Sequence, residues 1–147
     1  MKRQKCDVMD LDTVNYTKED AATFHKLLRM QKALVSHMAR RHKSKGTMLK
    51  AMAGETSERA RLKYVDYILT CMSQEIAELR DYLPWKTWKD NSKYSYKAVE
   101  KEIKYEVIDI LHFWLDLCLL LGMNGGDIVK YYFAKCWQNH QRQKKGY

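Results

Sequence analysis

The chain contains very few residues that interrupt helices. Its 147 residues include one proline, Pro84, and only 6 glycines. Lysine, glutamate, leucine, methionine and alanine, which are all well represented, favour helices. Apolar residues make up 46% of the chain, which excludes a disordered composition. A chain of this length can bury the core of one domain. We therefore predict an all-α protein.

Apolar residues recur at helical spacing in four segments, which we predict to be the main helices of an antiparallel bundle. The segments are 17–41, 57–82, 97–121 and 126–143. Thr17 is a suitable N-cap for the first helix and Asn124 for the last, and Pro84 ends the second. We expect residues 1–16 to form an irregular arm and 17–147 to form a single domain.

Two connections stand out by their length. Residues 40–57 contain a basic run, Arg40 to Lys45, followed by two glycines. We interpret this segment as a mobile connection with at most a short helical turn in its middle. The loop that follows Pro84 spans roughly 13 residues, and loops of that length are often functional.

The sequence favours a cytoplasmic protein. The longest apolar stretch, Ile108 to Met123, is too short and too charged to span a bilayer. No apolar segment follows the basic N-terminus, so we expect no signal peptide. The 4 cysteines form no C-x-x-C pair, which favours reduced thiols over a zinc site or disulfides.

Two acidic pairs lie within the predicted helices, Glu75 with Glu78 and Glu106 with Asp109. A spacing of three places both carboxylates of a pair on one helix face, with Cβ atoms about 5–6 Å apart. Two facing pairs would form an oxygen cage suited to Mg²⁺. The alternative is solvated surface acids, but Asp109 lies in the most apolar stretch, where an unpaired carboxylate is costly. His112, one turn further on, could donate to Asp109 or be structural.

A basic face follows on the last predicted helix. Lys135, Asn139 and Arg142 are spaced four and three apart, so they share one side of that helix. Arginine grips phosphate oxygens with two parallel hydrogen bonds, and lysine serves as a point charge. A solvated helix end is the alternative. Carboxylates for a metal, together with cations for phosphate, suggest metal-assisted chemistry on a polyphosphate.

Several motifs together resemble one protein family. They are Gln74-Glu75-Ile-Ala-Glu78, Trp85-Lys-Thr-Trp-Lys89, Glu106-Val-Ile-Asp109, Gly122-Met-Asn124 and Arg142-Gln-Lys-Lys-Gly-Tyr147. The chain resembles the all-α dimeric dUTPases, within the all-α NTP pyrophosphatase group that includes MazG-type enzymes. Its nearest resemblance is to the phage dCTP pyrophosphatase/dUTPase branch. The resemblance covers residues 27–147 and is most specific in the C-terminal third.

The resemblance implies a metal-dependent reaction. Glu75, Glu78, Glu106 and Asp109 would hold two or three Mg²⁺ ions, with Mn²⁺ as a substitute. Glu75 or Glu78 would orient or deprotonate a water whose pKa the metal lowers. Attack at the α-phosphorus would yield a nucleoside monophosphate and pyrophosphate. Gln74 departs from the pattern, because the family has a glutamate there, and we assign it no metal.

The resemblance also assigns residues to the substrate. The expected phosphate- or sugar-binding residues are Lys135, Asn139, Arg142 and Tyr147, and we add Lys89 to the phosphate group. Gln31 is expected to read the pyrimidine edge, since an amide both donates and accepts, and an exposed structural glutamine is the alternative. Trp88 is the preferred stacking residue for the base, with Trp85 a core residue. Asp116 could line the base pocket or support a core contact.

The expected function is hydrolysis of dUTP, dCTP or both by a homodimer that pairs through its second and third predicted helices. Such an enzyme would act in the cytoplasm, or in the host cytoplasm if a phage encodes it. One alternative is a MazG-like enzyme for a purine or modified nucleotide. Another is a basic helical nucleic-acid-binding protein, supported by the net charge of +9. The acidic pairs argue against a nucleic acid partner, because they repel phosphates when no metal is bound.

Overall fold

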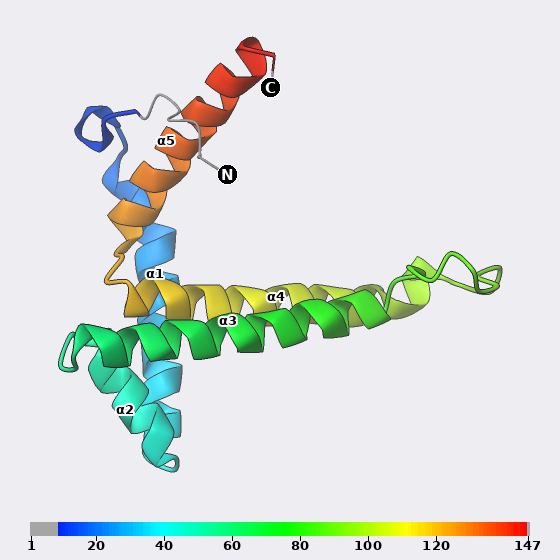
Figure 1. Cartoon of the computed structure of the whole chain (residues 1–147), viewed down its shortest axis with the longest axis horizontal. Coiled ribbons are helices and arrows are strands. Elements are labelled where there is room, and N and C mark those ends of the chain that lie inside the picture. Colours follow the sequence, from blue (N-terminus) through cyan, green and yellow to red (C-terminus); the bar gives the residue numbers. More distant parts are fainter. Residues whose placement is uncertain (1–8, 147) are drawn as a thin grey trace. The chain divides into compact units, whose positions relative to one another are not determined.

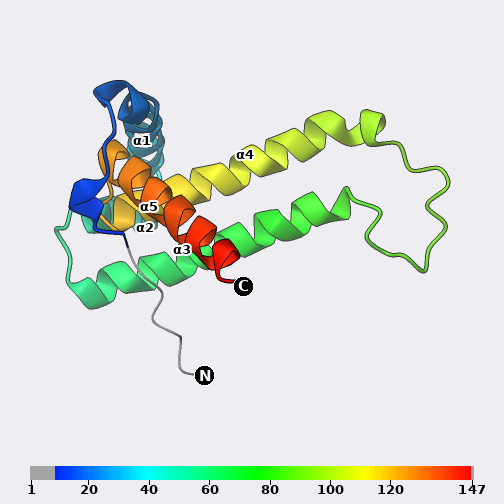
Figure 2. The same cartoon turned by 90° about the horizontal axis from the view of Figure 1, so that it is seen from above.

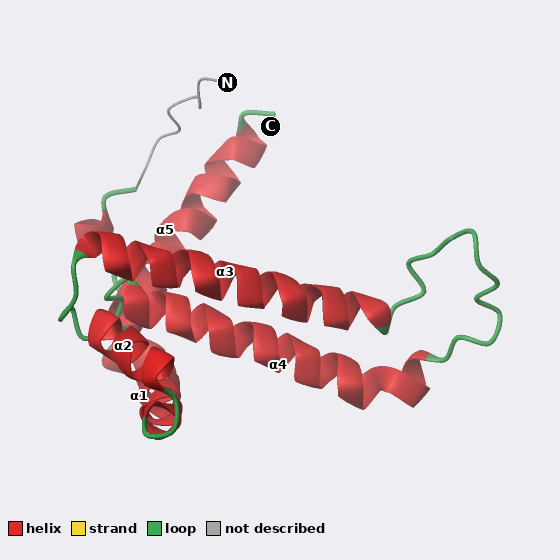
Figure 3. Cartoon of the chain, turned by 60° about the horizontal axis from the view of Figure 1, so that its bottom comes forward, coloured by secondary structure: helices red, strands yellow, loops and turns green. Residues whose placement is uncertain are grey.

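The computed structural model describes residues 9–146, and all regular structure in that range is helical (Figures 1 and 3). The elements are η1 (Leu11–Thr13), α1 (Lys18–Ala39), α2 (Lys43–Met52), α3 (Glu58–Asp81), α4 (Tyr96–Leu120) and α5 (Gly125–Lys144). The predicted all-α class is confirmed, and the arrangement is consistent with a helical bundle. Part of the predicted N-terminal arm forms the short 3₁₀ helix η1, and Val14 after it is buried.

The interpretation of residues 40–57 as a mobile connection was wrong. Residues Lys43–Met52 form the helix α2, and its Met48 and Ala51 are among the most buried side chains of the chain. The helix forms despite Gly46 at its centre because its apolar face packs on α3 and α4. The described residues therefore hold five α-helices where the sequence predicted four main ones.

The helix starts follow the predicted capping residues. Thr17 Oγ1 accepts a hydrogen bond from the Asp20 amide, and the Asp20 carboxylate accepts from the Thr17 amide. Asn124 and Asp127 form the same reciprocal arrangement at α5. Helix α4 ends at Leu120 with Leu121 as its C-cap, and Gly122 follows with a φ of 71°, a left-handed conformation that suits glycine.

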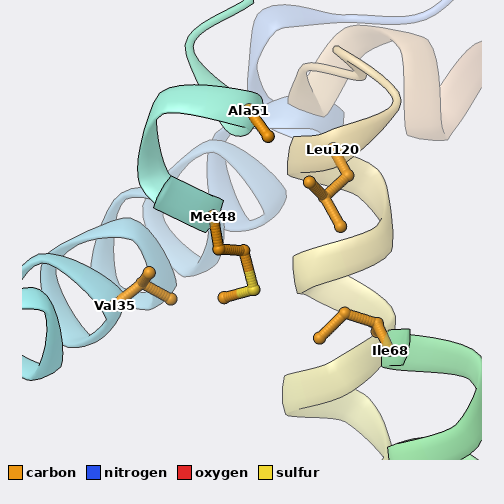
Figure 4. Close-up of a cluster of buried hydrophobic side chains, with 5 residues drawn as sticks. All are labelled: Val35, Met48, Ala51, Ile68 and Leu120. Atoms are coloured by element: carbon orange, nitrogen blue, oxygen red, sulfur yellow. The ribbon is translucent and has the colours of Figure 1, made fainter. Parts of the chain in front are cut away.

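The chain divides into two compact units, residues 1–30 with 123–147 and residues 31–122. In the second unit, α3 and α4 lie side by side as an antiparallel hairpin closed by the loop of residues 82–95 (Figures 1 and 2). α2 packs on both helices. The core of this unit joins four helices through a cluster of buried side chains (Figure 4). The cluster consists of Val35, Met48, Ala51, Ile68 and Leu120.

The first unit combines η1, the start of α1 and α5. Its buried side chains are Val14, Ala21, Leu28, Ile128, Val129 and Ala134. Gly125 and Gly126, the first two residues of α5, are also buried. The amide of Gly125 donates to His25 Nδ1 over 3.4 Å. A Cβ atom at position 125 would lie 2.7 Å from the backbone oxygen of Ala21, so only glycine fits this approach without displacement.

No helix in residues 9–146 combines the length and the apolar character that crossing a bilayer requires. Among the described cysteines, Cys71, Cys118 and Cys136 are free thiols. Burial raises the pKa of the Cys118 thiol to about 11, so this thiol is protonated and unreactive at neutral pH.

Candidate active site

The hairpin of α3 and α4 brings acidic side chains from both helices together. Carboxylate oxygens of Glu75, Glu78 and Glu106 all lie within 4.8 Å of one another. Two ligands of one Mg²⁺ lie at most about 4.2 Å apart, because each Mg–O bond is about 2.1 Å. The oxygens of the cluster lie within 4.8 Å of one another, which is close to this separation, and small side-chain rotations would suffice to fit an ion. Within residues 9–146, this is the only cluster of its kind, and its all-oxygen donor set fits a hard divalent cation.

Burial and neighbouring acids raise the pKa of two carboxylates of the hairpin, those of Glu75 and Glu106. The pKa of Glu75 is raised by burial and then by the charges of Glu78, Asp109 and Glu106. The pKa of Glu106 is likewise raised by burial and by Glu78 and Asp109. Asp109 thus acts on the cluster electrostatically, although its oxygens are not among those of the close group. Four negative charges on neighbouring helices disfavour ionisation, and a bound cation would relieve their repulsion.

Replacing Glu75 with Gln should stabilise the protein when divalent ions are removed, because it eliminates one of these repelling charges. An acid whose pKa rises on folding takes up protons as the chain folds. Its contribution to stability therefore falls as the pH increases above its ordinary value of 4.5. In EDTA, the Tm of Glu75→Gln should match the wild type near about pH 4 and exceed it by about 1–3 °C near pH 7. A Tm difference that does not vary with pH would contradict this electrostatic picture.

Gln74, which departs from the acidic pattern, contacts the cluster directly. Its Nε2 donates to Glu78 Oε1 over 2.9 Å, one helical turn away. The amide therefore holds one oxygen of a candidate metal ligand, and it adds no negative charge. This contact gives Gln74 a supporting role that the sequence did not reveal.

Gln31 lies in a buried polar network instead of on an exposed surface. Its Nε2 donates to Asp116 Oδ1 over 2.8 Å, and its Oε1 lies 2.6 Å from His112 Nδ1. Burial raises the pKa of Asp116, while the Gln31 hydrogen bond and the charges of Lys45 and His112 oppose that rise. His112, considered above as a donor to Asp109, thus uses its Nδ1 on Gln31. Lys45 belongs to the basic run whose helix, α2, the sequence did not predict.

The loop between α3 and α4 carries a pair of tryptophans. The rings of Trp85 and Trp88 meet edge to face, with centroids 5.8 Å apart. The guanidinium of Arg80 lies 4.0 Å from the centre of the Trp85 ring, which fixes this partly buried ring. Trp88 is 72% exposed and Lys89 beside it is exposed. One face of Trp88 is therefore available to stack on a flat ligand.

The basic residues predicted to hold phosphate lie on α5, within the first unit. Lys135 and Asn139 are exposed and Arg142 is partly buried. Lys135 Nζ donates to Gln138 Oε1 over 2.7 Å. Tyr147, the remaining residue of this predicted group, lies outside the described residues. The structure thus gathers the acids on one hairpin, and it groups the α5 residues on a helix of the other unit.

A sequence profile of one protein family, described as dUTPase, matches residues 23–120. The chain belongs to the dUTPase family. The matched segment contains the whole α3–α4 hairpin, and with it all four candidate metal ligands. Membership in this family confirms the resemblance found in the sequence.

Two curated proteins resemble part of the chain. The dCTP pyrophosphatase of Enterobacteria phage T4 is 40% identical over 74 residues, which cover 43% of this chain and 42% of that protein. The dCTP pyrophosphatase of Enterobacteria phage LZ5 is 37% identical over 71 residues, covering 43% and 41% respectively. The chain thus spans about two fifths of the length of these relatives. No solved structure matches the chain significantly.

Proposed function

We propose that this protein hydrolyses a pyrimidine deoxynucleoside triphosphate, dUTP, dCTP or both, to the monophosphate and pyrophosphate. The observation that carries the proposal is the convergence of Glu75, Glu78 and Glu106 on the α3–α4 hairpin of a dUTPase-family chain. The phage relatives, named dCTP pyrophosphatases, support a reaction of this class. Its setting would be the cytoplasm, including that of a host if a phage encodes the protein.

The acidic cluster is the proposed site for Mg²⁺. Glu75, Glu78, Glu106 and Asp109 would hold two or three ions, since four carboxylates supply enough oxygens and enough negative charge for them. When bound, the metal supplies charge neutralisation at the phosphates and lowers the pKa of water. Glu75 or Glu78 would orient the attacking water and accept its proton. The Gln74 amide would keep the Glu78 carboxylate in one orientation.

Each unit carries residues that we propose for substrate binding. Lys89, Lys135, Asn139 and Arg142 offer donors and positive charge for phosphate oxygens, and Tyr147 completes the proposed set. The exposed ring of Trp88 would stack on the base. Gln31 would recognise the edge of the pyrimidine, because its amide carries both a donor and an acceptor.

The test is incubation of the purified chain with each of the common dNTPs, with Mg²⁺ and with EDTA, followed by measurement of pyrophosphate and monophosphate. We expect release from dCTP or dUTP only when the metal is present. Release of orthophosphate alone would place the cut at a different bond. Hydrolysis of purine nucleotides in preference to pyrimidines would favour the MazG-like alternative. No product from any nucleotide would reject the proposal.

We also propose that two copies pair through the α3–α4 hairpin. Leu62, Leu69 and Ile76 recur every seven residues on α3, and each is about half exposed. Val107 and Ile108 on α4 are similarly exposed. Half-exposed apolar side chains on both helices of a pair are typical of a surface that a second helix pair covers.

Replacing Leu69 with Glu should convert the proposed dimer to a monomer, because the charge would be buried without a partner. Light scattering after size-exclusion chromatography reports the mass directly. Thr70→Glu is the matched control, since it adds the same charge to the next, exposed position of the same helix. A wild-type chain that is monomeric at micromolar concentration, or a Leu69→Glu variant that stays dimeric, would contradict the pairing.

A further inference from the structure

Two polar side chains lie in the interior of the second unit. Gln31 is 4% exposed and Asp116 is 3% exposed, and no other polar or charged side chain in residues 9–146 is buried to this degree. Burying a carboxylate is costly unless hydrogen bonds or charges compensate it. Asp116 receives a hydrogen bond from Gln31 and favourable charge from Lys45 and His112. The chain therefore keeps an acid at a position where an apolar residue would pack at lower cost.

The hydrogen bonds determine which way the Gln31 amide faces. An ionised carboxylate only accepts hydrogen bonds, so the side of the amide that faces Asp116 must be the NH₂ group. The oxygen then faces His112, whose Nδ1 must carry the hydrogen. Imidazole can present either a donor or an acceptor at Nδ1, so His112 would tolerate both orientations. Asp116 tolerates only one, and it is the residue that prevents the amide from rotating by 180°.

The amide retains further hydrogen-bonding capacity after these contacts. A primary amide has two N–H donors and two acceptor positions on its oxygen, and the network uses one of each. The remaining donor and acceptor lie in a fixed order. Rotation of the amide by 180° would reverse that order.

The two candidate bases also differ in the order of donor and acceptor along their edges. Cytosine presents an acceptor at N3 and a donor at N4, whereas uracil presents a donor at N3 and an acceptor at O4. An amide that pairs with one edge in one orientation pairs with the other edge only after it rotates. A freely rotating glutamine would therefore accept both bases, and a fixed one would discriminate between them.

We propose that Asp116 is a specificity-determining residue, which fixes the orientation of the Gln31 amide and thereby selects one pyrimidine base over the other. The inference rests on the proposed function, in which Gln31 reads the base. In that role Asp116 is a positioning residue, since it acts on the substrate through Gln31. His112 contacts the oxygen of the amide and adapts to the orientation that Asp116 sets.

The experiment compares kcat/KM for dCTP and dUTP in the wild type, Asp116→Asn and Asp116→Ser. Asparagine and serine can each donate or accept, so both variants release the constraint on Gln31. We expect the ratio of the two kcat/KM values to move toward one by at least about tenfold, equivalent to about 1.4 kcal/mol. A role limited to packing would lower both values together and leave their ratio unchanged.

Cys118→Ala is the matched control, because Cys118 is a buried α4 residue two positions away and outside the network. It should lower the Tm and keep the wild-type ratio. If both position-116 variants fail to fold, Gln31→Met carries the test. Methionine keeps the length of the side chain and removes the amide, so it should lose the same discrimination.

The outcomes separate this inference from the proposed function. A wild-type protein that releases pyrophosphate from no dNTP would reject the function itself. An active wild type with equal kcat/KM for the two bases would overturn the inference alone, as would a folded position-116 variant with the wild-type ratio. Retention of that ratio in Gln31→Met would overturn it as well.

Discussion

Glu78→Gln should lower the rate of pyrophosphate release by about a thousandfold or more. Glutamine keeps the size of the side chain but removes the charge that a divalent cation requires, so the loss falls on metal binding and not on packing. A thousandfold corresponds to about 4 kcal/mol of transition-state stabilisation. Glu78 is exposed on α3, so the far-UV circular dichroism and the Tm of the metal-free variant should stay close to those of the wild type.

The matched control is Glu102→Gln, which removes an exposed carboxylate from α4 outside the acidic cluster. It should keep the wild-type rate within about twofold, because surface substitutions away from a site have small effects. Asp109→Asn tests the fourth acid and should also abolish turnover. If Glu78→Gln remained fully active with Mg²⁺, the assignment of the hairpin acids as metal ligands would be wrong.

Gly125→Ala should destabilise the protein by about 2–3 kcal/mol, which corresponds to a decrease in Tm of roughly 4–10 °C. The new methyl group would lie 2.7 Å from the Ala21 oxygen and 2.8 Å from the His25 amide nitrogen. Both are backbone atoms of α1, and they cannot move without distorting the helix. Thermal unfolding followed by circular dichroism measures the effect.

Gly46→Ala provides the opposite control in the same protein. Position 46 lies inside α2, and nothing lies within 4 Å of a Cβ atom placed there. Alanine favours the helix by about 0.5–1 kcal/mol over glycine, so this variant should be slightly more stable than the wild type. A Gly125→Ala variant as stable as the wild type would show that α5 begins further from α1 than the structure indicates.

The sequence predicted a helix well where the segment itself contains a start signal, such as a capping residue. Thr17 and Asn124 are capping residues by type and by spacing, and both cap helices in the structure. Helix α2 was missed because Gly46 and the preceding basic run are typical of a loop. Met48 holds this segment in place through contacts with distant helices, and such contacts leave no periodic trace in ten residues.

In the candidate site, too, local spacing could be predicted from the sequence and contacts between distant residues could not. The acidic pairs could be predicted because a spacing of three has a fixed meaning on a helix. The bond between Gln31 and Asp116 could not, because 85 residues separate the two and no local pattern identifies the partner of either. The contact of Gln74 with Glu78 lies within one turn, but an exposed glutamine on a helix has many possible partners.

The four candidate acids lie in pairs on two separate helices, α3 and α4, and this arrangement limits how the site can evolve. Within each helix, the backbone hydrogen bonds fix the separation of Glu75 from Glu78 and of Glu106 from Asp109. The distance between the two pairs depends on the spacing of α3 and α4, which the side chains packed along their seam set. Larger or smaller residues at that seam would tune the proposed cation site to ions of different ionic radius, without any change to the four acids themselves.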